Sequence, residues 1–117
     1  MLNQVVLVGR IAKDPEVKEL EDGKKVSNIT LAVPRSYKNA DGVHETDFID
    51  CTLWNNLATN TTEYCKKGDI VGVKGLLRTD NYEKDGKYVY KLDLVAERVT
   101  FLSSRDRNEK QATAEAR

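Results

Sequence analysis

The sequence predicts an all-β fold with one helix, in which about five short and strongly bent strands close into a barrel. Three observations support this prediction. Segments that alternate apolar and polar residues recur along the chain, three Asp-Gly pairs mark tight turns beside them, and one helical segment lies between the third and fourth strands. The 117 residues fit a single domain with one modest core.

The first strand is expected over residues 3–12. Gly9 interrupts its apolar run, which indicates a bulge or a sharp bend. Asp14-Pro15 ends this strand, and extended structure resumes over residues 16–20. Asp22-Gly23 then marks the first hairpin turn.

The next two strands, at residues 26–33 and 45–54, are separated by a second turn at Asp41-Gly42. Pro34 indicates an edge or a strand end. In the first strand the side expected to face the core carries Ser27, Ile29, Leu31 and Val33. In the second strand the core side carries Ile49, Cys51 and Leu53, and the other side carries Phe48, Asp50, Thr52 and Trp54. Large aromatic side chains on the side away from the core need a functional reason.

A helix is expected over residues 55–67. Asn55 or Asn56 would cap its start, and Lys66-Lys67-Gly68 would suit its end. The face expected to pack on the core carries Leu57, Thr61, Tyr64 and Cys65. Only one helix is predicted, which excludes a ferredoxin-like module because that fold needs two.

The last strands are expected over residues 69–79, 88–96 and 99–102, with the third turn at Asp85-Gly86. Gly72 and Gly75 mark bend points or close approaches of the backbone. Residues 1–102 therefore form the predicted domain, and residues 103–117 form a flexible polar tail. This order of elements predicts a five-stranded OB-fold barrel with long β-hairpins.

Composition narrows the function classes. Nineteen basic residues balance nineteen acidic ones, so any binding of nucleic acid must depend on a local groove. Cys51 and Cys65 have no partners with metal-binding spacing, and we expect two buried free thiols in a reducing, cytoplasmic compartment. The N-terminal residues do not resemble a signal peptide, and no apolar run is long enough to cross a membrane.

Catalysis finds little support. His44 is the only histidine and lies in a turn beside Glu45. Asp47 and Asp50 fall on opposite faces of a strand, so they are not expected to share a metal. No glycine-rich phosphate loop is present. We therefore expect no enzyme activity, catalytic residue, metal or cofactor.

Aromatic residues beside basic ones point to single-stranded nucleic acid, because aromatic rings stack on unpaired bases and cations hold the phosphates. The predicted stacking residues are Tyr37, Phe48, Trp54 and Tyr82. The predicted phosphate contacts are Arg35, Lys38, Lys67, Lys74 and Arg78. Stacking alone does not distinguish DNA from RNA.

Several segments resemble the bacterial and phage single-stranded DNA-binding proteins. The resemblance covers roughly residues 1–102 and is carried by NQVVLVGR (3–10), DPEV (14–17), SNITLA (27–32), Tyr64, Lys67-Gly68 and GLLRT (75–79). It implies the same barrel, usually assembled as a homotetramer that wraps the strand. The family's four stacking aromatics correspond to Tyr37, Phe48, Trp54 and Tyr82.

The sequence also departs from this family. Asp50, Asp80 and Asn81 stand where bacterial members often carry basic residues, which counts against tight electrostatic binding. The acidic tip that ends in Pro-Phe and recruits partner enzymes is absent, since the given sequence ends in Glu115-Ala116-Arg117. Recruitment of replication and repair enzymes through such a tip is therefore not expected. Two explanations of the absent tip stay open: the chain is a short phage, plasmid or accessory member of the family, or its tail was cut away.

The function predicted is a non-enzymatic protein that coats and protects single-stranded DNA during replication, recombination and repair. It would act in the cytoplasm, associated with the nucleoid or in a phage-infected cell. The alternative is an OB-fold protein–protein adaptor of the replication machinery, similar to a primosome component, whose aromatic residues would contact a protein partner. A small hydrolase or nuclease is the third and least supported hypothesis.

Overall fold

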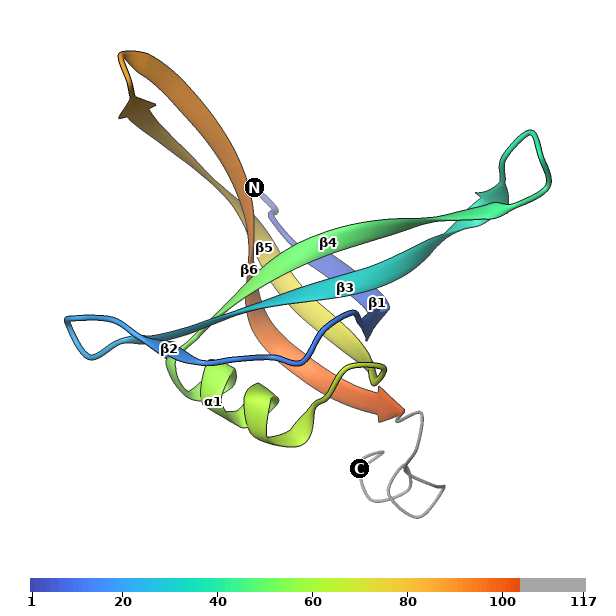
Figure 1. Cartoon of the computed structure of the whole chain (residues 1–117), viewed down its shortest axis with the longest axis horizontal. Helices are drawn as coiled ribbons and strands as arrows, with labels where there is room; N and C mark the ends of the chain where they lie inside the picture. The colour runs from blue at the N-terminus through green and yellow to red at the C-terminus, as the bar shows by residue number, and fades with distance from the viewer. Residues whose placement is uncertain (104–117) are drawn as a thin grey trace.

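Residues 1–103 are described by the computed structural model, and they form six strands and one helix (Figure 1). In chain order these elements are β1 (Val5–Ile11), β2 (Lys18–Glu19), β3 (Lys25–Lys38), β4 (His44–Trp54), α1 (Asn55–Tyr64), β5 (Ile70–Lys84) and β6 (Lys87–Ser103). The predicted tail at 103–117 falls, apart from its first residue, outside the described residues.

Five of the strands close into a barrel. The sheet order is β1-β5-β6-β4-β3-β2, and an additional pairing of β1 with β3 joins its two ends. Closure also depends on a short parallel contact between β4 and β6, which pairs Cys51 with Leu94. The other pairings are antiparallel. The prediction of a five-stranded OB-fold barrel is therefore confirmed, and β2 adds two residues beside β3.

The alternating patterns place the core as predicted. Ile29 and Leu31 of β3 are fully buried, as are Cys51 and Leu53 of β4. Residues from β1, β5, β6 and α1 complete the buried cluster: Ile11, Val71, Val73, Leu94, Ala96, Phe101 and Ala58, with Cys65 just beyond the helix. Cys51 and Cys65 are both buried and are not joined in a disulfide, as the sequence predicts.

Two glycines mark the places where strands come closest. A Cβ atom on Gly9 would lie 2.9 Å from the carbonyl oxygen of Ala32, at the point where β1 passes from β5 to β3. A Cβ atom on Gly75 would collide with the carbonyl oxygen of Val95, and the register of β5 against β6 shifts at this residue. Both positions are bend points, as predicted, because only glycine leaves room for the facing backbone.

The hairpins are longer than the sequence indicates. β3 continues past Pro34, which pairs with Thr46, and it ends only at Lys38. β6 is one continuous strand where two segments were expected, and β5 reaches Lys84. As a result the β3–β4 and β5–β6 hairpins extend far from the barrel (Figure 1).

The helix differs most from the prediction. It ends at Tyr64, and its cap residue is Trp54, which makes no capping hydrogen bond through its side chain. The Asn55 side chain is engaged elsewhere, because its Oδ1 accepts a hydrogen bond from the Lys25 backbone N–H at 3.2 Å. Tyr64 is 61 % exposed, so the expectation that it belongs to the core is wrong. Cys65 is already extended and ends the helix before the lysines.

Candidate nucleic-acid interface

The outward face of β4 carries two aromatic residues. Phe48 is 67 % exposed and Trp54 is half-buried, whereas Leu53 between them on the opposite face is fully buried. Trp54 lies six positions after Phe48 along the strand, which corresponds to about 20 Å. The predicted parity of β4 is confirmed, and it leaves two aromatic surfaces of the kind that unpaired bases stack on.

Polar side chains cover the surface between these two aromatics. The Thr30 hydroxyl of β3 donates to Asp50 Oδ1 at 2.7 Å. The Thr52 hydroxyl donates to Asp93 Oδ1 of β6 at 2.7 Å and lies 3.1 Å from Asn28 Oδ1. Asp93 reaches Thr52 because β4 and β6 run side by side in parallel at this point. The closure of the barrel thus places two carboxylates on the stacking face.

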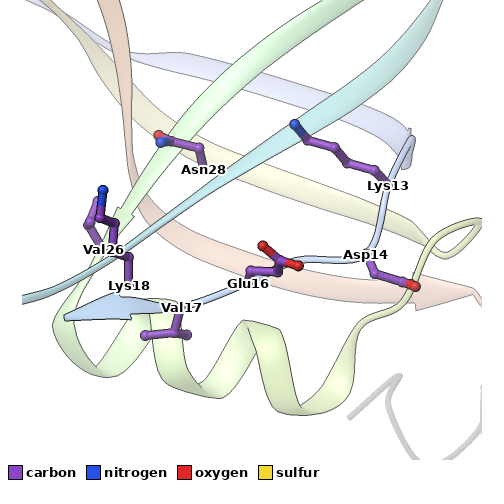
Figure 2. A pocket seen from close by; sticks show the side chains of 7 residues that line it. All are labelled: Lys13, Asp14, Glu16, Val17, Lys18, Val26 and Asn28. Carbon is purple, nitrogen blue, oxygen red and sulfur yellow. The ribbon is translucent and has the colours of Figure 1, made fainter.

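Two hollows follow this face. The larger has a volume of about 670 Å³ and lies between β3 and the segment that connects β1 to β2 (Figure 2); its lining residues are Lys13, Asp14, Glu16, Val17, Lys18, Val26 and Asn28. The smaller, of about 330 Å³, is lined by Lys13, Asn28, Thr30, Asp50, Thr52, Lys91, Leu92 and Asp93. Because Lys13 and Asn28 line both, the two hollows are neighbours, and the surface that they mark across β3, β4 and β6 is called the groove below.

The β5–β6 hairpin adds Tyr82 and Arg78 to one side of the groove. Arg78 is paired in register with Asp93, and Tyr82 lies four residues further along the same face of β5. Tyr82 is 46 % exposed. Arg78 therefore shares a strand face with Tyr82, a predicted stacking residue, and lies opposite Asp93, a groove residue.

The β3–β4 hairpin carries Tyr37, which is 64 % exposed, and Arg35. The Arg35 guanidinium is already paired: its Nη1 lies 2.7 Å from Glu45 Oε2, and its Nη2 lies 3.0 Å from Asp47 Oδ1. The hydrogen bond and charge of Arg35 lower the pKa of the Asp47 carboxyl below its usual value. Asp47 in turn raises the pKa of Arg35, so this ion pair competes with any phosphate for the guanidinium.

The three predicted lysines lie apart from one another. Lys38 is exposed at the end of β3. Lys67 follows α1, and its backbone N–H donates to Asp14 at 2.7 Å, which places it beside the larger hollow. Lys74 is paired with Val6 on the outer face of β1 and β5, away from the β4 face. None of the predicted stacking residues or phosphate contacts lines either hollow: Phe48 and Trp54 lie on the outer face of β4 beside Asp50 and Thr52, and Arg78 lies opposite Asp93.

The sequence did not single out the side chains that make the floor of the groove. Asn28 and Thr30 lie within the SNITLA segment and Thr52 shares the face of Phe48, but no binding role was predicted for any of them, and Asp93 joins them only through the non-local contact of β4 with β6. Tyr88 and Tyr90 of β6 are exposed on the β5–β6 hairpin. Alternation along β4 places Asp50 and Thr52 on the face of Phe48 and Trp54, but it cannot show that Asp93 of β6 lies beside Thr52.

Three further properties can be read from the described residues: whether they could bind a metal ion, act as a nucleophile or span a membrane. Within residues 1–103 no group of three or more His, Cys, Asp and Glu side chains is placed to hold a metal ion. Burial raises the pKa of the Cys51 thiol to about 11, with smaller contributions from Asp50 and Asp93, so the thiol stays protonated at neutral pH. No helix in the described part of the chain is long and apolar enough to span a membrane.

Comparison with known proteins gives the family. The single-strand binding protein family matches residues 2–102, which is most of the chain. This protein belongs to the single-strand binding protein family. The match extends over the whole barrel and both long hairpins, and it includes every residue that forms the groove.

Individual relatives are similar over the same region. Single-stranded DNA-binding protein B of Bacillus subtilis is 46 % identical over 108 residues, which are 92 % of this chain and 96 % of the relative. Single-stranded DNA-binding protein 3 of Listeria innocua is 49 % identical over 106 residues, 90 % of this chain and 66 % of the relative. A single-stranded DNA-binding protein of Bacillus cereus is 47 % identical over 107 residues, 91 % of this chain and 63 % of the relative. The chain thus spans nearly all of the first relative and just under two thirds of the other two.

Proposed function

We propose that this protein binds single-stranded DNA by stacking bases on exposed aromatic residues of its OB-fold barrel. The observation that carries the proposal is the parity of β4, which turns Phe48 and Trp54 outward while Leu53 fills the core. Family membership and the names of the relatives support the same ligand. Stacking tolerates any base, because every base has an aromatic face.

The groove and the aromatic residues beside it define a path for a bound DNA strand. Bases would stack on Phe48 and Trp54, and the two hairpins would add Tyr37 and Tyr82 at their sides. The phosphates would meet basic residues at the rim: Arg78, Lys38 and Lys67, together with Lys13 and Lys91, which line the hollows. Arg35 would contribute only if a phosphate displaced Asp47 or Glu45, and Lys74 stays a predicted phosphate contact that lies beside Val6, away from the β4 face.

In the cell such binding would coat single-stranded DNA during replication, recombination and repair, melt hairpins and block nucleases. The role needs no catalysis, metal or cofactor, and it places the protein in the cytoplasm, on the nucleoid or in a phage-infected cell. Balanced charge predicts moderate affinity, and phosphate contacts make it sensitive to salt.

We also propose that copies of the chain assemble, as a homotetramer, through the outer face of β1, β5 and β6. Val6 is 66 % exposed and Val8 54 %, and Leu102 lies beside Val8 across Gly72. Such a continuous apolar surface is typical of an interface between proteins. Light scattering of the wild type and of Val8→Glu checks this: an assembled wild type and a dissociated variant are expected, and a monomeric wild type would contradict it.

A labelled single-stranded oligonucleotide titrated with the protein tests the binding proposal by fluorescence anisotropy, with unlabelled duplex and RNA as competitors. Single-stranded DNA should compete fully and duplex only weakly. Equal competition by duplex would contradict stacking, because paired bases do not expose their faces.

The alternative of a protein–protein adaptor predicts another outcome. If the exposed aromatics contact a protein, Trp54→Ala would leave the affinity for DNA unchanged and abolish a partner contact. Loss of DNA affinity in Trp54→Ala would instead favour the binding proposal.

A further inference from the structure

We infer that Asp50 contacts the edge of a bound base and gives this protein a preference for cytosine over thymine. The inference rests on the proposed binding of single-stranded DNA and concerns the same groove. It starts from the position of Asp50, which lies on the same face of β4 as Phe48 and Trp54 and is two residues from Phe48. At this spacing the two side chains stand about 7 Å apart, so a base stacked near Phe48 brings its edge over the carboxylate.

The groove floor offers hydrogen-bond acceptors at this point. Thr30 has one hydroxyl proton, and it is donated to Asp50 Oδ1 at 2.7 Å. Thr52 is committed in the same way to Asp93. Among the described residues, Asp50 Oδ2 makes no hydrogen bond. The threonines therefore hold the carboxylates in place and leave free acceptor capacity facing the groove.

The charges of the groove determine which part of the strand can approach this floor. Two carboxylates repel the anionic phosphates, whereas Lys13 and Lys91 line the same hollow and attract them. In Figure 2 Lys13 projects from the segment that follows β1, while Asn28 projects from β3 itself. A bound DNA strand that keeps its phosphates at the lysines and away from the carboxylates turns the edges of its bases toward Asp50.

Cytosine and thymine then differ at one atom that matters. Both have a single ring, but position 4 carries an amino donor in cytosine and a carbonyl acceptor in thymine. A carboxylate accepts a hydrogen bond from the cytosine amino group. It forms no hydrogen bond with the thymine carbonyl, because both groups are acceptors and repel each other. A hydrogen bond to a charged group is strong enough to change affinity by about tenfold.

Dissociation constants for oligo-dC and oligo-dT of equal length test the inference, measured at mildly alkaline pH so that oligo-dC stays unpaired. In Asp50→Asn the ratio of the oligo-dT to the oligo-dC constant should fall by about tenfold, because an amide can donate or accept and no longer discriminates. Asp85→Asn is the matched control: it removes the same charge from the turn of the β5–β6 hairpin, where asparagine also tolerates the positive φ, and should leave the ratio unchanged. Thr30→Val keeps the charge but releases the carboxylate, and it should lower the ratio as well.

The outcomes separate the two proposals. A ratio in Asp50→Asn that equals the wild-type ratio would overturn the role of Asp50 while binding itself persists. If Asp50→Asn does not fold, an unchanged ratio in Thr30→Val would overturn it instead. A wild-type protein that binds neither oligonucleotide would overturn the proposed function, and this inference with it.

Discussion

Phe48→Ala is expected to weaken the binding of single-stranded DNA strongly and to destabilise the fold much less than the truncation of a core residue would. The side chain is 67 % exposed on β4, so it contacts solvent where a base would stack. Truncation removes the stacking surface, but it removes little of the core, which is formed by the residues of opposite parity such as Leu53.

The magnitudes follow from these exposures. Stacking is worth about 1–3 kcal/mol per base, so the dissociation constant should rise about 5- to 150-fold. A fully buried phenylalanine costs about 3–5 kcal/mol when cut to alanine, and the third of Phe48 that is covered scales this to roughly 1–1.5 kcal/mol. Titration with oligo-dT measures the first quantity, and urea denaturation measures the second.

Leu53→Ala is the matched control on the same strand. Leu53 is fully buried, so its truncation should lower the free energy of unfolding by about 2–5 kcal/mol and leave the DNA affinity of the folded protein unchanged. The reasoning would be refuted by the reverse pattern, in which Phe48→Ala destabilises the fold by as much as Leu53→Ala and binds DNA as the wild type does.

Three other expectations concern stability and reactivity. Gly75→Ala should lower the melting temperature, with a cost of about 1–3 kcal/mol, because the new methyl group would press on the Val95 carbonyl; an unchanged melting temperature would contradict the close approach. Arg35 lowers the pKa of Asp47 from 3.8, so the ion pair stabilises the fold above pH 3.8, and this contribution is lost as the pH falls below that value and Asp47 becomes protonated. The difference in stability between the wild type and Asp47→Asn should therefore vanish in acid, and a difference independent of pH would argue against the pair. The Cys51 thiol, with its pKa raised to about 11, should resist alkylation until urea unfolds the protein, and rapid labelling of the native protein would show that it is accessible.

Local patterns predicted most of the barrel. Alternation over β3 and β4 separated Ile29 and Leu53 from Phe48 and Trp54, because a strand turns successive side chains to opposite faces and burial acts on one of them. The Asp-Gly turns were equally readable: Asp85 and Gly86 both have positive φ, which a two-residue hairpin turn requires.

Features that depend on register were not predictable in the same way. Arg35 meets Asp47 and Glu45 only because β3 runs on past Pro34 and stays paired with β4. No local signal distinguishes such an arginine from one that is free to bind a phosphate. Tyr64 was misplaced as well: it is the last residue of the helix and is 61 % exposed, whereas Cys65, which follows the helix, is buried.

The groove floor shows the same limit for the candidate site. The aromatic residues could be chosen from the sequence, and their role as stacking residues stays a prediction. The carboxylate of Asp93 beside Thr52 could not be found, because 41 residues separate them and only the closure of the barrel brings them together.

Titration of the intrinsic fluorescence of Trp54 with oligo-dT, repeated with duplex DNA and at several salt concentrations, tests the central claim most directly. Trp54 is the only tryptophan, so the signal reports one position in the groove. Strong quenching by oligo-dT and little by duplex is expected, with affinity falling as salt rises by about 0.7 log units per phosphate contact for each log unit of salt. No quenching, together with no binding by anisotropy, would contradict the claim that this face binds single-stranded DNA.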